Sequence, residues 1–325
     1  MTGKQNTVNN DKILQANAKS INKAINALKN GELIGLPTET VYGLAANALD
    51  DRAVLNIYEA KQRPSFNPLI VHVSGIDMAM AVAKVTPLAK KLMTEFWPGP
   101  LTIVLKRLSD CPLSEFVSAG LDSVALRSPN HPVAIKVLHE AKLPLAAPSA
   151  NKSGTISPTT AAHVLDGLEH EVAYVLDGGA SDVGVESTIV SVVDDKVILL
   201  RPGSISAEII ENCLGVKLIN EAATPKTPSE ITAPGQLESH YAPQNSLRLN
   251  AEAANKDEFL LGFGHIKGNL SLSQSGDVDE AAQNLFAMLR EADKETIGGI
   301  AIAPIPNQGI GIAINDRIKR AAAPK

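Results

Sequence analysis

A series of short apolar runs, each bounded by residues that favour turns, is the feature that most constrains the fold. After residue 60 these runs cover residues 69–73, 101–106, 124–127, 143–147, 172–176, 187–193 and 197–201. Apolar runs of this length between turn signals are typical of strands buried in a sheet. An earlier run at residues 32–36 predicts a further short strand. The sequence therefore predicts a sheet of many short strands.

Helix signals alternate with these strands. Residues 11–30 carry apolar side chains at helical spacing and are followed by Gly31, a common stop signal. Residues 50–62 place Val54, Ile57, Tyr58 and Lys61 on one helical face, with Lys61 near its C-terminal end. We expect a mixed α/β (α+β) fold, in which a twisted open sheet is flanked by helices.

Capping residues next to proline predict three more helix starts, because such pairs are common at helix N-termini. They are Thr86-Pro87, Asn130 to Pro132 and Ser157-Pro158.

The chain changes character at residues 220–244, NEAATPKTPSEITAPGQLESHYAPQ, which have no sustained period. A connection of this length in a compact protein is usually functional or disordered, so we predict a linker that acts as a lid. Beyond it we expect strands at 259–263 and 299–303, a helix at 277–292 and a last helix through 317–320. The predicted division is a domain at 1–219, a linker at 220–244 and a small Rossmann-like α/β domain at 245–325.

Composition argues against large charged partners. The net charge is −5 and only 3% of residues are aromatic, which disfavours adhesion to nucleic acid or anionic membrane and leaves little material for stacking bases. Cys111 and Cys213 lack metal-ligand spacing and are expected to be buried free thiols in a reducing cytoplasm. No apolar run is long enough to span a membrane, so we predict a cytoplasmic protein with no membrane contact and no metal site.

Several common catalytic motifs are absent. The sequence has no G-x-x-x-x-G-K-[ST] phosphate loop, no G-x-S-x-G elbow and no H-E-x-x-H zinc motif. The stretch GFGHIKG at 262–268 misses the dinucleotide-binding spacing by one residue, and we interpret it as a turn.

Polar and cationic residues instead recur at the ends of the predicted strands. They are Thr38-Glu39-Thr40, Lys61 to Pro64, Asn67-Pro68 with His72, Ser123 with Arg127-Ser128, Pro148 to Asn151 with Ser157, Glu186 to Thr188, and Arg201 to Gly203. Ligands of open α/β sheets bind outside strand ends, so these clusters are expected to converge on one crevice.

The chemistry of this set favours positioning over covalent catalysis. Four cations, Lys61, Arg63, Arg127 and Arg201, suit polyphosphate and carboxylate groups. No activated nucleophile or His-carboxylate pair accompanies them. Phosphoryl or nucleotidyl transfer needs such a site, because it depends mainly on positioning and charge neutralisation. A polyphosphate substrate would arrive with Mg²⁺, and no tightly bound organic cofactor is expected.

The motifs PTETVYGLAANA, YEAKQRPSFNPLIVHV, FWPGPLTIVL, VALRSPNHP, LAAPSANKSGTISPT, DGGASDVGVESTIV and LLRPGSIS stand in this order along the chain. Together they resemble the YrdC-like threonylcarbamoyl-AMP synthases, and PGQLESHYAP resembles the longer, two-domain form of that family. The resemblance covers roughly residues 31–243, with the C-terminal part matched by coarse pattern only.

The resemblance implies a synthase that makes L-threonylcarbamoyl-AMP and pyrophosphate from ATP, L-threonine and bicarbonate or CO₂. A separate transferase would then modify the adenosine beside the anticodon of tRNA, and direct contact with tRNA is an open expectation. A carbamate made from threonine is already anionic, so attack on the α-phosphorus needs no strong general base. That would explain the missing catalytic pair.

The resemblance also assigns site residues. Those expected around threonine are Thr38, His72, Arg127, Ala147 and Ser187, and Arg127 is the natural partner of its carboxylate. Those expected along ATP are Lys61, Arg63, Ser123, Ser149, Asn151, Ser157, Arg201 and Tyr241, with Lys61 and Arg63 as the catalytic cations.

Two alternatives remain at this point. A non-enzymatic module that binds double-stranded RNA or tRNA is disfavoured by the net charge and the scarce aromatic residues. A related carbamoyl-transfer enzyme of hydrogenase maturation would carry acylphosphatase-like and zinc-finger modules, for which this chain has neither the length nor the cysteines.

Overall fold

The computed structural model describes residues 10–193, 196–220, 233, 239–296 and 298–324. Its first part holds the strands β1 (Ile13–Gln15), β2 (Ile34–Leu36), β3 (Gly43–Asn47), β4 (Ile70–His72), β5 (Leu101–Lys106), β6 (Ser123–Arg127), β7 (Leu145–Ala146), β8 (Tyr174–Asp177), β9 (Thr188–Val193), β10 (Lys196–Arg201) and β11 (Ile219–Asn220). Its helices are α1 (Ala18–Lys29), α2 (Asp51–Lys61), α3 (Ile76–Met80), α4 (Pro87–Phe96), α5 (Pro132–Ala141), α6 (Ala161–Leu168) and α7 (Ala207–Leu214).

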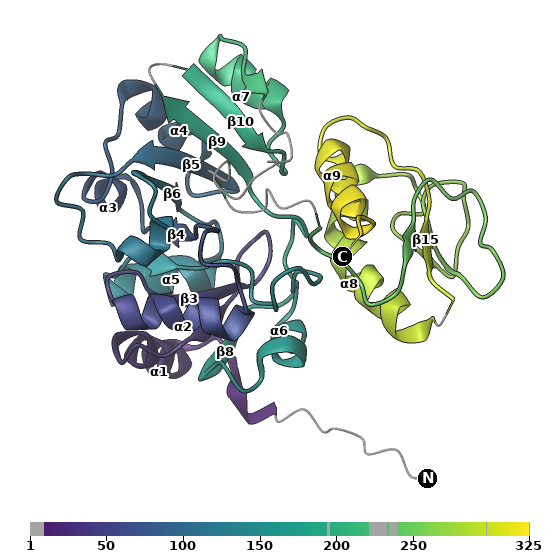
Figure 1. The fold of residues 1–325 in the computed structure, drawn as a ribbon, viewed down its shortest axis with the longest axis horizontal. Helices are drawn as coiled ribbons and strands as arrows, with labels where there is room; N and C mark the ends of the chain where they lie inside the picture. Colours follow the sequence, from purple (N-terminus) through teal and green to yellow (C-terminus); the bar gives the residue numbers. More distant parts are fainter. Residues whose placement is uncertain (1–9, 194–195, 221–232, 234–238, 297, 325) are drawn as a thin grey trace.

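The strands form one mixed sheet, in the order β1-β8-β2-β3-β7-β4-β6-β5-β9-β10-β11 (Figure 1). Some neighbouring strands are parallel, such as β4 and β6, and others are antiparallel, such as β5 and β6. The predicted mixed α/β sheet with flanking helices is therefore confirmed.

Alternate residues of each strand face opposite sides of this sheet. On one side, Val71, Ile103 and Leu126 pack with helices α2, α4 and α6 in the largest apolar cluster. The other side is covered in two different ways. Helices α1 and α5 pack over its β8-β2-β3-β7 end, whereas Ile70, Val104, Ala125 and Ile189 form a small apolar patch on its remaining part.

Helix starts follow the capping chemistry in most cases. Thr86 caps α4, with Pro87 in the first turn, and His131 caps α5 ahead of Pro132, so these two predicted starts are confirmed. The predicted start at Ser157-Pro158 is wrong. The helix α6 begins at Ala161, and its cap is Thr160, whose hydroxyl accepts from the His163 backbone N–H.

The predicted helix over residues 11–30 is also wrong at its beginning. Residues Asn10–Lys12 form a 3-10 turn, and β1 then pairs in parallel with β8 before α1 begins at Ala18. The pairing partner lies about 160 residues away in the sequence, as the register of Ile13 with Val175 shows, so local pattern could not reveal it.

The C-terminal part is a small parallel sheet with two helices. Strands β12 (Leu247–Arg248), β13 (Phe259–Gly262), β14 (Leu270–Ser271) and β15 (Ile300–Ile302) lie in the order β12-β15-β13-β14, accompanied by α8 (Val278–Glu295) and α9 (Gly311–Ala321). The predicted smaller Rossmann-like α/β unit is confirmed. In Figure 1, α8 and α9 lie on the side of this unit that faces the large sheet.

The two parts share an apolar cluster. Val41, Ile156 and Val185 of the first part pack with residues of α8, α9 and the small sheet. The backbone at Gly184 approaches α8 so closely that a Cβ built there would lie 2.3 Å from the Ala282 carbonyl oxygen. This contact fixes the loop that leads into β9.

Candidate active site

A pocket lies on the side of the large sheet that α1 and α5 cover only in part. Ile70 and His72 of β4, two residues apart, point to this side, and Arg127 of β6 pairs with His72 in the register. The loops around residues 38–43 and 147–149, the stretch from Glu186 to Ser187, Arg201 and the pair His240-Tyr241 complete the wall. The predicted strand-end clusters therefore meet in one place.

The loop after β2 is held by its own hydroxyls. The Thr38 hydroxyl donates to the Val41 carbonyl at 2.6 Å and lies 3.0 Å from the Thr40 hydroxyl. Ser181 donates to the Thr38 carbonyl at 3.0 Å, which ties this loop to the one that precedes β9. A rigid, buried loop thus presents Thr38 and Thr40 to the pocket.

Arg127 and Glu39 form a buried ion pair at one end of the pocket. Arg127 Nη2 lies 2.7 Å from Glu39 Oε1, and both side chains are less than a tenth exposed. The angles do not make a hydrogen bond, so both groups retain hydrogen-bonding capacity. Arg127 Nε donates to the Gly99 carbonyl at 3.3 Å, which orients the guanidinium.

His72 is a neutral imidazole beside this pair. Burial lowers its pKa well below the ordinary range, and the nearby Arg127 lowers it further. Its Nδ1 is buried and has no hydrogen-bond partner in the described part of the chain. This ring is therefore suited to a ligand's polar group rather than to a fixed structural contact.

Arg63 lies near the first residues of β4, whereas His72 is the last residue of that strand. Its Nε donates to the Asn67 carbonyl at 3.0 Å, and its Nη2 donates to the Asn67 side chain at 2.7 Å and to the Pro68 carbonyl at 2.8 Å. Burial lowers the pKa of Arg63 to about 10, so the side chain stays cationic at neutral pH.

Lys61 lies beneath the loop that follows β7. Its Nζ donates to the backbone carbonyls of Ser149 and Asn151, each at 2.6 Å. Burial, and then the charge of Arg63, lower the pKa of Lys61 well below the ordinary range. In this arrangement the lysine supports the loop that carries Ser149 into the pocket.

Arg201 joins the end of β10 to the start of β9. Its Nη2 donates to the Ser187 carbonyl at 2.9 Å and to the Ser187 hydroxyl at 3.2 Å. The Ser187 hydroxyl also lies 2.7 Å from that of Thr102. Burial lowers the pKa of Arg201 to about 10, which leaves a third arginine cation in the pocket wall.

Glu186 is a carboxylate in the same wall. Ser157 donates to its Oε1 at 2.6 Å, and Arg317 of α9 donates to its Oε2 at 2.9 Å. Burial alone would raise the pKa of Glu186, but Arg317, Arg201 and the bond from Ser157 outweigh burial and lower it. Glu186 is therefore an anion at neutral pH.

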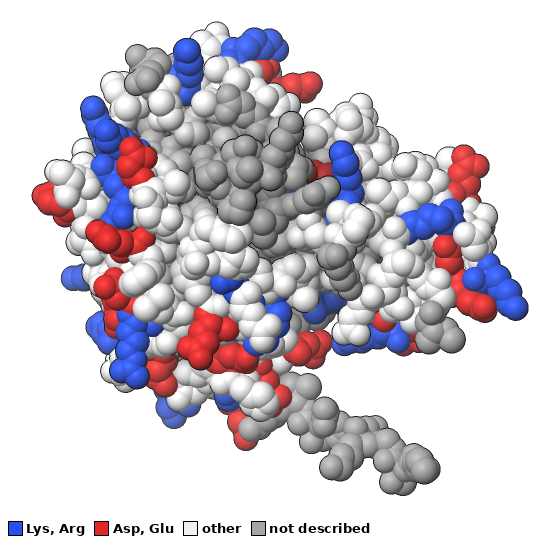
Figure 2. All heavy atoms as spheres, in the orientation of Figure 1, with Lys and Arg blue, Asp and Glu red and all other residues white. Residues whose placement is uncertain are grey.

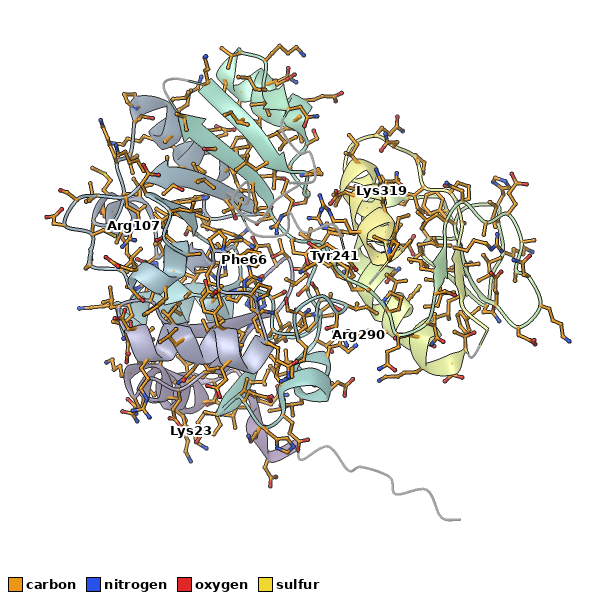
Figure 3. All side chains as sticks on the ribbon, viewed as in Figure 1. Lys23, Phe66, Arg107, Tyr241, Arg290 and Lys319 are labelled. Carbon is orange, nitrogen blue, oxygen red and sulfur yellow. The ribbon has the colours of Figure 1, made fainter. Side chains whose placement is uncertain are left out.

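Tyr241 and His240 connect the pocket to the C-terminal part. The Tyr241 ring stacks on Phe286 of α8, with a centroid distance of 5.6 Å, and Arg317 lies 5.5 Å from its centroid. Figure 3 shows Tyr241 between the large sheet and α9. Burial, and then the charge of Arg63, lower the pKa of His240 well below the ordinary range, so this second imidazole is also neutral.

The structure brings most of the predicted site residues together. Thr38, Arg63, His72, Arg127, Ala147, Ser149, Ser187, Arg201 and Tyr241 line the pocket. Three others are connected to this wall by hydrogen bonds: Lys61 donates to the carbonyls of Ser149 and Asn151, and Ser157 donates to Glu186. Ser123 is not among the lining residues and begins β6, four residues before Arg127.

Sequence reasoning missed several residues that shape the pocket. Glu39 and Glu186 lie within the predicted polar clusters and His240 lies beside Tyr241, but none of the three is predicted as a site residue. Their sequence signal was a carboxylate or imidazole within a dense polar motif. Arg317 had no such signal, because its contact with Glu186 spans 131 residues.

Other predictions concern metals, cysteines and charge. Within the described residues there is no group of three or more His, Cys, Asp or Glu placed to hold a metal ion, and no helix is long and apolar enough to cross a membrane. Cys111 and Cys213 are free, as predicted, but half-buried rather than buried. Figure 2 shows Lys and Arg interspersed with Asp and Glu on the face it presents, rather than gathered in one basic patch.

Comparisons with known proteins agree with this site. The family model for Sua5, YciO and YrdC, described as "Telomere recombination", matches residues 26–203, and the model described as "Threonylcarbamoyl-AMP synthase, C-terminal domain" matches residues 205–323. The chain is 39% identical to the threonylcarbamoyl-AMP synthase of Bacillus subtilis, over 95% of this chain and 94% of that protein. It is 37% identical to that of Pyrococcus abyssi, over 91% and 92%.

A solved structure is similar over nearly the whole chain. The crystal structure of P. abyssi Sua5 complexed with L-threonine has a TM-score of 0.88 and 34% sequence identity, and the match covers 95% of this chain and 97% of that one.

Proposed function

The chain belongs to the threonylcarbamoyl-AMP synthase family, and we propose that it makes L-threonylcarbamoyl-AMP and pyrophosphate from L-threonine, ATP and bicarbonate or CO₂. It is an enzyme, an adenylyltransferase. The observation that carries the proposal is the pocket in which Arg63, Arg127 and Arg201 lie with buried hydroxyls and a neutral His72.

The end of the pocket at Arg127 is proposed to bind threonine. The guanidinium already lies beside a carboxylate, that of Glu39, and a threonine carboxylate has the same chemistry. We assign Thr38, His72, Ala147 and Ser187 to the same end, where His72 offers an unpaired nitrogen and Ala147 leaves room for the substrate.

The end at Arg63 and Arg201 is proposed to bind ATP. We assign Lys61 and Arg63 as the catalytic cations and place Ser123, Ser149, Asn151, Ser157, Arg201 and Tyr241 along the nucleotide. Lys61 would act from behind the Ser149 loop, and approach of the triphosphate would raise its lowered pKa, since an opposite charge favours the cation.

The proposed reaction needs little from a general base. A carbamate oxygen of the carboxylated threonine attacks the α-phosphorus, a new O–P bond forms, and the bond to pyrophosphate breaks. The nucleophile is already anionic, so the arginines would serve to align it and to stabilise the charge of the departing pyrophosphate.

We propose that Mg²⁺ arrives with ATP as part of the substrate. Glu186 is the carboxylate at the proposed nucleotide end of the pocket wall, and both its oxygens already accept hydrogen bonds from Ser157 and Arg317. The metal would therefore be held by phosphate oxygens and water, as is common for Mg²⁺.

The stretch around Tyr241 is proposed to act as a lid. The space in the pocket that water can fill is only about 50 Å³, whereas ligand sites usually measure roughly 300–1,000 Å³. His240 and Tyr241 lie in its wall, and Ala233 packs on the apolar floor with Ile70 and Val104, so ATP entry would require this stretch to move. Residues 221–232 and 234–238 of the predicted lid lie outside the described residues.

We retain the division into a catalytic domain at 1–219, a linker at 220–244 and a C-terminal domain at 245–325 as a proposal. We also propose that a separate transferase passes the product to tRNA, in the cytoplasm. The net charge of −5 disfavours direct contact with tRNA.

The test is pyrophosphate release by the purified full-length chain with MgATP and bicarbonate. We expect release to depend on L-threonine and to fall sharply with L-alanine, while mass spectrometry identifies threonylcarbamoyl-AMP. Release that is equally fast without any amino acid would overturn the proposal.

A further inference from the structure

Glu186 presents an electrostatic problem at the nucleotide end of the pocket. It is a buried anion in a wall that, under the proposed function, holds the anionic phosphates of ATP. Like charges in a buried site repel strongly, because water screens them little. A carboxylate there needs a cation of its own.

Arg317 supplies that cation from the C-terminal domain. Its side chain is fully buried, its Nε donates to Glu186 at 2.9 Å, and its Nη1 donates to the Pro202 carbonyl at 2.9 Å and to Asp316 at 2.7 Å. Pro202 follows Arg201 directly, so the guanidinium fastens both the carboxylate and the backbone next to a pocket arginine. The fixed fork of arginine allows this, whereas lysine offers a single point charge.

The joint between the domains does not depend on this contact alone. Arg290 of α8 donates to the Ile156 carbonyl, Lys294 lies 3.2 Å from Asp166, and α8 packs against Gly184. No residue of these three contacts lines the pocket. Arg317 differs because its partner, Glu186, does line the pocket.

We propose that Arg317 is a positioning residue for the nucleotide end of the active site, acting through Glu186. It neutralises the carboxylate and holds it toward Ser157, so that the wall presents net positive charge to ATP. The C-terminal domain thereby completes the nucleotide site. This inference rests on the proposed function.

The test measures the KM for ATP and the KM for threonine separately in full-length Arg317→Met, Arg317→Lys, Glu186→Gln and Arg317→Met/Glu186→Gln. We expect Arg317→Met to raise the KM for ATP by about tenfold or more, which corresponds to roughly 1.4 kcal/mol, and to leave the KM for threonine within about twofold. Calorimetry with a non-hydrolysable ATP analogue should show the same loss. Lysine should restore only part of it.

The double variant makes the test specific, because it removes Arg317 without leaving an unpaired buried anion. In the Glu186→Gln background, loss of Arg317 should change the KM for ATP by less than about threefold. The matched control is Arg290→Met, which breaks an interdomain contact outside the pocket and should leave both KM values unchanged.

An Arg317→Met protein that folds and keeps the wild-type KM for ATP would overturn the inference, as would equal rises for ATP and threonine. If that variant does not fold, the double variant is compared with Glu186→Gln instead. A KM for ATP that rises much further in the double variant would contradict the inference. A wild-type protein without threonine-dependent release would instead refute the proposed function itself.

Discussion

Substitution of Gly184 by alanine should separate the two domains locally and weaken use of ATP. Gly184 has a φ of +77°, and a Cβ there would lie 2.3 Å from the Ala282 carbonyl oxygen and 2.5 Å from the Gln283 Cα. The left-handed backbone costs an alanine about 1–2 kcal/mol, and overpacking against a helix backbone adds about 1–3 kcal/mol. The expected loss of stability is therefore about 2–5 kcal/mol.

The matched control is Gly215→Ala, since Gly215 has nearly the same φ, +75°, but nothing within 4 Å of its Cβ position. It should lose only the backbone part, about 1–2 kcal/mol. Urea unfolding followed by the fluorescence of Trp97, the single tryptophan, gives the stabilities. Pyrophosphate release gives the KM for ATP, which should rise only in the Gly184 variant, because Glu186 follows two residues later.

Equal losses of stability in the two variants would refute the reasoning, since the difference between them is the contact with α8. A Gly184 variant that is destabilised as expected but keeps its KM for ATP would show that the loop does not transmit the displacement to the pocket.

Two further predictions follow from buried charges. Arg127→Met should raise the KM for threonine about 100-fold, because a charged hydrogen bond contributes about 1.5–3 kcal/mol. The double variant Arg127→Met/Glu39→Gln should regain thermal stability but not affinity for threonine. An unchanged KM for threonine in Arg127→Met would contradict the assignment. Burial, and then Arg290, lower the pKa of His163 to about 4 from an ordinary 6.5, so between these values the unfolded chain binds more protons and stability falls as the pH falls. His163→Gln should flatten that slope in urea titrations from pH 7 to pH 4, and an unchanged slope would argue against a neutral His163.

Much of the sheet could be predicted from local pattern. The run over residues 101–106 coincides with β5, and the other apolar runs match strands to within one or two residues at most ends. The strand β3 was not predicted, because GLAAN has no β-branched residue and resembles a turn or helix as much as a strand. Its pairing with β2 and β7 makes it a strand, and pairing is a tertiary property.

The site shows the same division between local and distant information. Clustered hydroxyls and arginines at strand ends predicted where the pocket lies, because the sheet geometry brings such ends together. The burial, the pKa and the hydrogen-bond partners of each group could not be predicted. The sequence predicts Lys61 as a site cation, but not its complete burial, which lowers its pKa. Ser157 reads as a helix cap, yet its hydroxyl donates to Glu186.

The apolar cluster shared by the two domains affects how the chain can be engineered. Val41, Ile156 and Val185 are covered by side chains that come from beyond residue 240, and Gly184 requires a helix of matching contour. A small domain taken from a distant relative would therefore not pack on this interface unless the residues it contacts on the large domain were exchanged with it. The unit that can be exchanged between proteins is the small domain together with both surfaces of the interface.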